Sequence, residues 1–98
     1  MTTSLNRTAS DAFLESLSRG GVDVAFCVFG TDHAGLIESW AKHREDNNLS
    51  PVPRPVICQH ENVAMNGALG YAHFSGHAQA VVAHVDVGTL NLGAGLHN

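Results

Sequence analysis

The chain has 98 residues and a mass of 10.4 kDa, enough for one small domain and too little for two. Apolar residues make up 44% of it and charged residues 14%, so a buried core is expected and global disorder is not. Five Lys and Arg against nine Asp and Glu give a net charge of −4 with His neutral. This excess of acidic groups argues against nucleic acid as a partner.

The first half of the chain predicts a helix, a strand and a second helix. Apolar residues at helical spacing from residue 9 to residue 17 predict an amphipathic helix, with Thr8 near its start and Gly20-Gly21 as its stop. A continuous apolar run at 24–28 predicts a strand covered on both faces. The residues expected to face inward are Ala9, Ala12, Phe13 and Leu17, then Leu36, Ile37, Trp40 and Ala41; those expected to face outward include Asp11, Glu15, Glu38 and Lys42.

The second half predicts two more strands and a helix between them. A polar segment at 46–54 leads into an apolar strand at 55–59, and an alanine-rich stripe predicts a helix from Glu61 to about residue 75. Residues 79–85 predict a third strand, residues 86–89 a turn, and residues 91–98 the opening of a further helix. Because that last helix has neither a cap nor a following strand, we expect the chain to be cut within a domain.

The spacing of the predicted strands indicates the fold class. They start near residues 24, 56 and 80, which is roughly the 30-residue repeat of right-handed βαβ units. We therefore expect an α/β fold, a flavodoxin-like parallel sheet with helices on both faces. Residues 1–98 would form one partial domain, with no second domain.

Localisation follows from features that the sequence lacks. No apolar run approaches the ~18 residues of a membrane span, and the N-terminus has no apolar core of a secretory signal. Cys27 and Cys58 are too few for a disulfide scaffold, and each is expected to be a buried, inert thiol inside a strand. We expect a cytoplasmic protein without a membrane partner.

Candidate ligand-binding residues gather where the predicted strands end, because ligands of parallel α/β sheets bind outside the carboxyl ends of the strands. Three segments meet this condition: residues 29–33, His60-Glu61, and residues 86–91. Glu61 follows a strand and opens a helix, so burial would raise the pKa of its carboxyl and the helix N-terminus would lower it. A purely structural interpretation, in which Glu61 only stabilises the first helical turn, remains open at this point.

The glycines and histidines give weaker signals. Gly30 and Gly88 allow a backbone to approach a ligand closely, although no phosphate-binding glycine motif is present. Thr31 and Asp32 are expected to be helix caps. His33, His60 and His84 lie at the expected rim and could touch a ligand, whereas His43, His73 and His77 are expected to be solvated surface residues. The spacing of His73 and His77 allows a zinc protein as a third alternative, but no metal site is expected.

A known family has a similar arrangement of motifs. Residues 59–65 (QHENVAM), 70–72 (GYA) and 75–76 (SG) resemble a signature of thiamine diphosphate enzymes related to acetolactate synthase and benzoylformate decarboxylase. The similarity is to their N-terminal pyrimidine-binding domain and extends over roughly residues 8–98. Further landmarks in the same order are the opening helix, the turn at Gly30, and Gly88 followed by Asn91.

The resemblance implies roles for particular residues. Glu61 would be the catalytic glutamate, which hydrogen-bonds the aminopyrimidine ring of thiamine diphosphate and so promotes removal of the thiazolium C2 proton. A raised pKa of this carboxyl would suit that role, so burial is expected to prevail over the helix dipole. Gly30, Gly88 and Asn91 would also bind the cofactor. The weaker candidates for substrate contacts are His33, His60 and His84.

The resemblance also implies what the chain needs from elsewhere. In this family a separate C-terminal domain holds Mg²⁺ and the diphosphate, and the 98 residues contain no counterpart of its motif. We therefore expect a thiamine diphosphate-binding domain of a 2-oxo acid carboligase or decarboxylase that is inactive alone. It would act in a homo-oligomer or with a complementary diphosphate-binding domain. The alternative is a non-catalytic binding or interaction module derived from that family.

Overall fold

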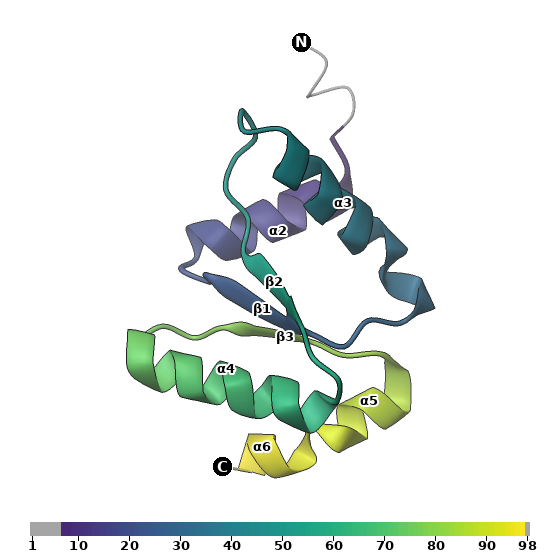
Figure 1. The fold of residues 1–98 in the computed structure, drawn as a ribbon, viewed down its shortest axis with the longest axis vertical. Coiled ribbons are helices and arrows are strands. Elements are labelled where there is room, and N and C mark those ends of the chain that lie inside the picture. The colour runs from purple at the N-terminus through teal and green to yellow at the C-terminus, as the bar shows by residue number, and fades with distance from the viewer. Residues whose placement is uncertain (1–6, 98) are drawn as a thin grey trace.

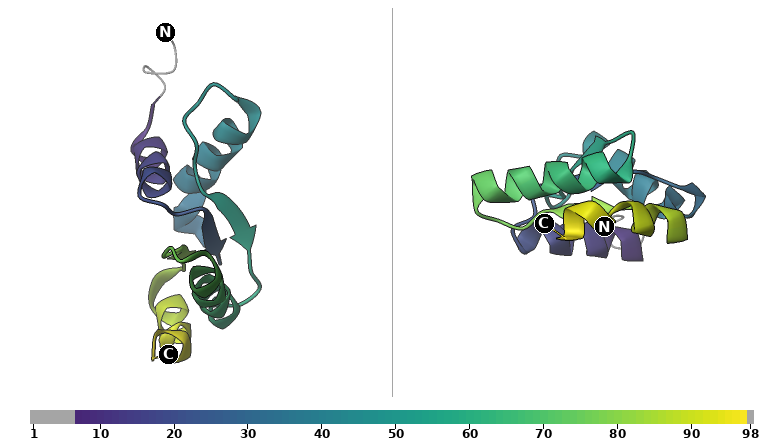
Figure 2. Two further views of the ribbon diagram at one scale, coloured as in Figure 1. Left: turned by 90° about the vertical axis from the view of Figure 1, so that its left-hand side faces the viewer. Right: turned by 90° about the horizontal axis from the view of Figure 1, so that it is seen from below.

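The computed structural model describes residues 7–97 and has the predicted α/β order. Its elements are α2 (Ala9–Arg19), β1 (Val24–Cys27), η1 (Thr31–His33), α3 (Ala34–Glu45), β2 (Arg54–Ile57), α4 (Glu61–Ser75), β3 (Ala80–Val82), α5 (Val85–Asn91) and α6 (Gly93–His97). The three strands are parallel, in the order β2-β1-β3. Helices α2 and α3 lie on one side of the sheet, and α4, α5 and α6 on the other (Figure 1 and Figure 2). The flavodoxin-like fold class is confirmed.

The central strand β1 aligns the three strand ends at one edge of the sheet. Ala25 is paired with Pro55 of β2 on one side and with Ala80 of β3 on the other. Backbone hydrogen bonds continue past the strands, from Cys58 N to Cys27 O (2.8 Å) and from Val28 N to Val82 O (2.9 Å). The three segments that follow the strands therefore share one rim, as expected for parallel strands.

The predicted helix ends are confirmed. Thr8 and Asp11 form a reciprocal capping box at the start of α2, in which each side chain accepts from the other residue's backbone N–H. Gly21 follows α2 with φ +98°, and Gly76 ends α4 with φ +81°. Only glycine adopts this left-handed conformation without strain, so both positions stop their helices for the expected reason.

The predicted inward face of α2 is wrong in part: Leu17 packs against the core as expected, but Phe13 does not. Phe13 is 52% exposed, whereas Leu14, Asp11 and Glu15 are each at most 2% exposed. Leu14 packs with Ala25, Cys27 and Trp40 in the core. Helix α2 is therefore rotated relative to the predicted stripe, and two carboxylates enter the interface with α3.

Partners on α3 explain the burial of these carboxylates. Asp11 accepts a hydrogen bond from Ser39 Oγ at 2.5 Å and forms an ion pair with Lys42, which had been expected to face outward. Glu15 lies 2.8 Å from His43 Nε2 and 2.7 Å from the guanidinium of Arg7. His43, expected at the surface, has a side chain only 4% exposed. Buried charge is tolerated here because each carboxylate has charged and hydrogen-bonding partners.

Because Asp11 and Glu15 are buried as paired carboxylates, we expect the protein to lose stability in acid. Burial would raise the pKa of Asp11, but hydrogen bonds from Lys42, Ser39 and the Thr8 backbone lower it overall; the hydrogen bond from Arg7 lowers the pKa of Glu15. Because both folded-state values lie below the unfolded values of about 4, the stabilisation is complete above that pH and is lost as pH falls further. The free energy of unfolding, measured with urea, should fall between pH 6 and pH 3, by roughly 1 kcal/mol from Asp11 and by a further amount from Glu15. A flat profile would contradict the pairing.

The C-terminal part differs from the prediction in its local structure. The expected turn at 86–89 lies within α5, and Asn91 ends that helix instead of opening the next one. Val85, the first residue of α5, has φ +41°, which is unusual for a β-branched residue. Residue 98 of the predicted final helix and the N-terminal residues 1–6 lie outside the described range. No helix within residues 7–97 is long and apolar enough to cross a membrane.

Candidate functional site

Glu61 is the first residue of α4 and stands at the rim where the strands end. Its side chain is 13% exposed, and its Oε1 accepts a hydrogen bond of 3.0 Å from Asn91 Nδ2 at the end of α5. Glu61 and Asn91, two of the predicted cofactor-binding residues, are 30 residues apart in the chain and are in direct contact. The carboxyl group is held in one position by a side chain from the other side of the site.

The electrostatic environment of Glu61 differs from the expected one. The hydrogen bond from Asn91, together with one from the Glu61 backbone, lowers the pKa of this carboxyl, and partial burial opposes them only weakly. Burial was expected to prevail and to raise the pKa; that expectation is wrong for this structure. Two hydrogen-bond donors stabilise the ionised carboxylate. Their effect on the pKa is larger than the opposing effect of the incomplete burial.

Gly88 packs closely beside the second oxygen of Glu61. It is buried in α5, and a Cβ atom at position 88 would lie 3.3 Å from Glu61 Oε2 and 3.4 Å from Cβ of Ala83. The first distance is tighter than most Cβ contacts in proteins, so a larger residue would crowd the carboxylate. Glycine at this position therefore lets the backbone of α5 lie against Glu61.

A second cluster at the same rim joins Asp32, His33 and His84. His84 Nδ1 lies 2.7 Å from Asp32 Oδ1, and His33 Nε2 lies 3.7 Å from the same oxygen. The two imidazole rings meet edge to face, with centroids 5.8 Å apart. Asp32, expected to be a helix cap, instead pairs with His84. The backbone hydrogen bond from Gly88 N to His84 O (3.1 Å) links this cluster to the Glu61 side of the rim.

Hydrogen bonds define the tautomers in this cluster. His33 Nδ1 accepts from the backbone N–H of Gly30 at 2.9 Å, so in a neutral ring the proton is on Nε2, toward Asp32. His84 donates from Nδ1 to Asp32, which leaves its Nε2 as the lone-pair nitrogen. Within residues 7–97, these three residues are the one group with the spacing of metal ligands. His33 Nε2 carries a proton in this arrangement, so the donor set fits a hydrogen-bond network better than a metal ion.

Gly30 makes room for His84. A Cβ atom at position 30 would lie 2.1 Å from Cγ and Nδ1 of the His84 ring. Gly30→Ala should therefore displace His84 from Asp32 and cost roughly 1–3 kcal/mol of stability. The displacement would appear as loss of the Nδ1–H tautomer of His84 in imidazole ¹⁵N spectra, and the cost as a lower melting temperature.

Gly70→Ala is a matched control for this substitution. Position 70 lies in α4 with nothing within 4 Å of an added Cβ, so alanine should stabilise the helix by about 0.5–1 kcal/mol. If Gly30→Ala left both the stability and the His84 signals unchanged, the assigned role of Gly30 would be wrong.

The remaining histidines have other positions. His60 is the N-cap of α4: its Nδ1 accepts from Asn62 N at 3.0 Å, and its Nε2 lies 4.0 Å from Glu61 Oε1. Half of its side chain, 54%, is exposed, so it stands beside the site. His73 and His77 are exposed, as predicted. Cys27 is fully buried, and burial raises the pKa of its thiol to about 12, which confirms an inert cysteine.

Comparison with known protein families assigns the chain to one family. Residues 7–98 match the family described as thiamine pyrophosphate enzyme, N-terminal TPP binding domain. The chain belongs to this family. Thiamine pyrophosphate is another name for thiamine diphosphate, so the match agrees with the resemblance carried by residues 59–76. The Glu61 rim is accordingly part of an N-terminal thiamine pyrophosphate-binding domain.

A curated relative is similar to this TPP-enzyme domain over most of its length. It is the "Putative acetolactate synthase large subunit IlvX" of Mycobacterium tuberculosis (strain ATCC 25618 / H37Rv), with 34% identity over 91 residues. The aligned region covers 91% of this chain and 16% of the relative. The chain therefore spans about one sixth of the length of that protein. No solved structure matches the chain significantly.

Two features of this TPP-enzyme domain do not follow from its sequence patterns. Asp32 was expected to be a cap, because its partner His84 is 52 residues away and no local pattern indicates the pair. The cavity between α3 and β2 likewise has no sequence signal. The one available signal was that Gly30, Asp32 and His84 all follow strand ends.

Proposed function

We propose that this chain supplies the pyrimidine-binding half of a thiamine diphosphate site in a protein with acetolactate-synthase-like carboligase or 2-oxo acid decarboxylase chemistry. The observation that carries the proposal is the Glu61 carboxylate, partly buried at the sheet rim and held there by Asn91. A partly buried carboxylate at this rim suits a heterocycle with ring nitrogens and an amino group, to which it can hydrogen-bond. This supports the pyrimidine end of the cofactor as the ligand of Glu61.

Different residues of the chain would have different roles at this site. Glu61 would hold a proton at a pyrimidine ring nitrogen, and cover by the bound ring would raise the pKa of its carboxyl by removing water. Gly30 and Gly88 would let the backbone approach the cofactor. His84, with a lone pair on Nε2, would accept a proton or hydrogen bond from the substrate, and His33 and His60 would flank it. When bound, the cofactor supplies an electron sink for the carbon that loses carbon dioxide.

Mg²⁺ and the diphosphate would be held by a separate domain, in a second copy or a complementary chain. The 98 residues contain no Gly-Asp-Gly motif to bind them. We therefore propose that the 98-residue chain alone does not turn over 2-oxo acids, and that the assembled protein works in the cytoplasm. Acetolactate formation or pyruvate decarboxylation by the purified chain would contradict this.

Calorimetry tests cofactor binding directly. Thiamine diphosphate is titrated into the chain alone, and into the chain mixed with Mg²⁺ and the diphosphate-binding domain of an acetolactate synthase large subunit. Saturable binding is expected only in the mixture and should be weakened by Glu61→Ala but not by Glu38→Ala, an exposed residue of α3. Absence of binding in a mixture whose domains associate would contradict the proposal.

One observation favours the second candidate, a non-catalytic interaction module. Large apolar side chains of the α4–α6 layer are exposed: Phe74 95%, Leu90 76%, Val87 66% and Leu96 62%. An apolar surface of this kind is typical of an interface. Association with the diphosphate-binding domain without any cofactor binding would favour this function over the first.

A further inference from the structure

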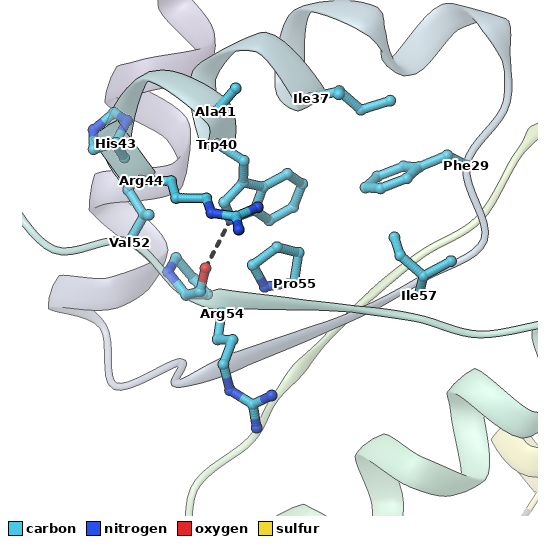
Figure 3. Close-up of a pocket in the computed structure, with 11 residues that line it drawn as sticks. Phe29, Ile37, Trp40, Ala41, His43, Arg44, Val52, Arg54, Pro55 and Ile57 are labelled. Atoms are coloured by element: carbon cyan, nitrogen blue, oxygen red, sulfur yellow. Dashed lines mark hydrogen bonds between the residues drawn. The ribbon is translucent and has the colours of Figure 1, made fainter. Parts of the chain in front are cut away.

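A cavity of about 540 Å³ lies between α3 and β2, on the face of the sheet away from α4 and Glu61 (Figure 3). Its size lies within the range of ~300–1,000 Å³ that is typical of small-molecule sites. Most of its lining is apolar: Phe29, Ile37, Trp40, Ala41, Val52, Pro53, Pro55 and Ile57. None of the residues proposed for the cofactor site lines this pocket.

Two aromatic rings give the pocket a defined shape. The centroids of Phe29 and Trp40 are 5.7 Å apart, with their planes inclined at 56°. Trp40 donates from Nε1 to Pro53 O at 2.7 Å, so its indole is held against the chain that leads into β2. Because the polar atom of Trp40 is satisfied inside the protein, the ring presents an apolar surface to the cavity. The pocket walls are therefore already shaped to receive the flat or branched apolar part of a ligand.

The charge at the pocket is positive. Arg44 lines the end near Val52, opposite the end formed by Phe29 and Ile57 (Figure 3). No ion pair of Arg44 is found among residues 7–97. Arg54 points away from the other lining residues in Figure 3. The guanidinium of Arg44 is therefore the cation available to a bound molecule.

The backbone of β2 argues against a peptide strand as the occupant. Arg54 N and Cys58 N donate to Asp23 O and Cys27 O of the central strand, so positions 54, 56 and 58 face β1 and Pro55 faces outward. Proline has no N–H, so this edge lacks a donor that an added strand would need. A small molecule fits the pocket better than an added β-strand.

We propose that this pocket binds a small amphiphilic carboxylate. Its aromatic or branched apolar body lies against Trp40 and Phe29, and its carboxylate pairs with the guanidinium of Arg44. The planar fork of arginine suits a carboxylate, which it can bind through two parallel hydrogen bonds.

Trp40 reports the binding, because the chain contains a single tryptophan. The 98-residue chain is titrated with 3-phenylpropionate and with 3-phenylpropionamide, which has the same body without the charge, and the emission of Trp40 is followed. We expect saturable binding with the carboxylate about 10-fold tighter than the amide. Arg44→Gln should remove this difference, whereas the matched control Arg54→Gln should preserve it.

Filling the pocket tests its location. Ala41→Phe, at an exposed position of α3 that lines the cavity, should abolish binding of the carboxylate while the far-ultraviolet dichroism stays unchanged. If that variant does not fold, Ile37→Phe replaces it. Equal affinity for acid and amide, binding that survives a filled and folded pocket, or self-association that buries Trp40 as the chain is concentrated would each overturn the proposal.

Discussion

Glu61→Gln is expected to slow exchange of the thiazolium C2 proton of thiamine diphosphate by about 10²- to 10⁴-fold in the assembled site, which is the usual contribution of a positioned acid or base. An amide cannot hold and return a proton at the pyrimidine nitrogen as a carboxyl group can. Its oxygen can still accept the hydrogen bond that Asn91 now donates to Oε1 of Glu61. The substitution therefore removes the proton-transfer group and keeps the local structure.

The exchange rate is measured by proton–deuterium quench experiments with the chain, Mg²⁺ and the complementary diphosphate-binding domain. Glu38→Gln is the matched control, since it makes the same chemical change on the exposed surface of α3 and should leave exchange unaffected. Melting temperatures of the two variants should agree closely with that of the original chain. Exchange at an unchanged rate in a Glu61→Gln protein that binds the cofactor would refute the role of Glu61.

Asp11→Ala is expected to lower the free energy of unfolding by about 3 kcal/mol, an unusually large effect for a polar residue. The side chain is almost fully buried and makes three interactions: with the Thr8 backbone, with Ser39 Oγ and with Lys42. Its removal breaks the capping box of α2 and leaves the hydroxyl of Ser39 without its acceptor inside the helix interface. Loss of a cap and of a buried partner each typically cost about 1–2 kcal/mol.

Urea unfolding of three variants separates the contributions. Asp11→Asn keeps acceptors for Thr8 and Ser39 but removes the charge, so it should cost less than Asp11→Ala. Glu45→Ala removes the same charge from an exposed position near the end of α3 and should change stability by less than ~0.5 kcal/mol. Equal stability of Asp11→Ala and Glu45→Ala would show that the buried carboxylate contributes nothing.

Much of the fold follows from local sequence patterns. The strands at 24–27, 54–57 and 80–82 and the alanine-rich helix α4 form where apolar runs and helical periodicity predict them, and no boundary is shifted by more than three residues. Gly21 and Gly76 end helices because their backbone conformation depends on the residue itself. The parallel topology then brings the residues after each strand to one rim, which is why Glu61, Gly88 and Asn91 could be predicted together.

The sequence by itself therefore determined the α/β class, the order of the elements, the family and the position of Glu61, since these depend on residues close together in the chain or on the fixed geometry of βαβ units. Only the tertiary structure decided which side of α2 is buried, because Asp11 and Glu15 are stable inside only when Lys42 and His43 of α3 meet them. The pairing of Asp32 with His84, the low pKa of Glu61 and the pocket at Trp40 likewise arise between distant segments. The pKa of a side chain and the shape of a pocket depend on contacts between residues that are distant in the chain. The periodicity of one helix or strand carries no information about such contacts.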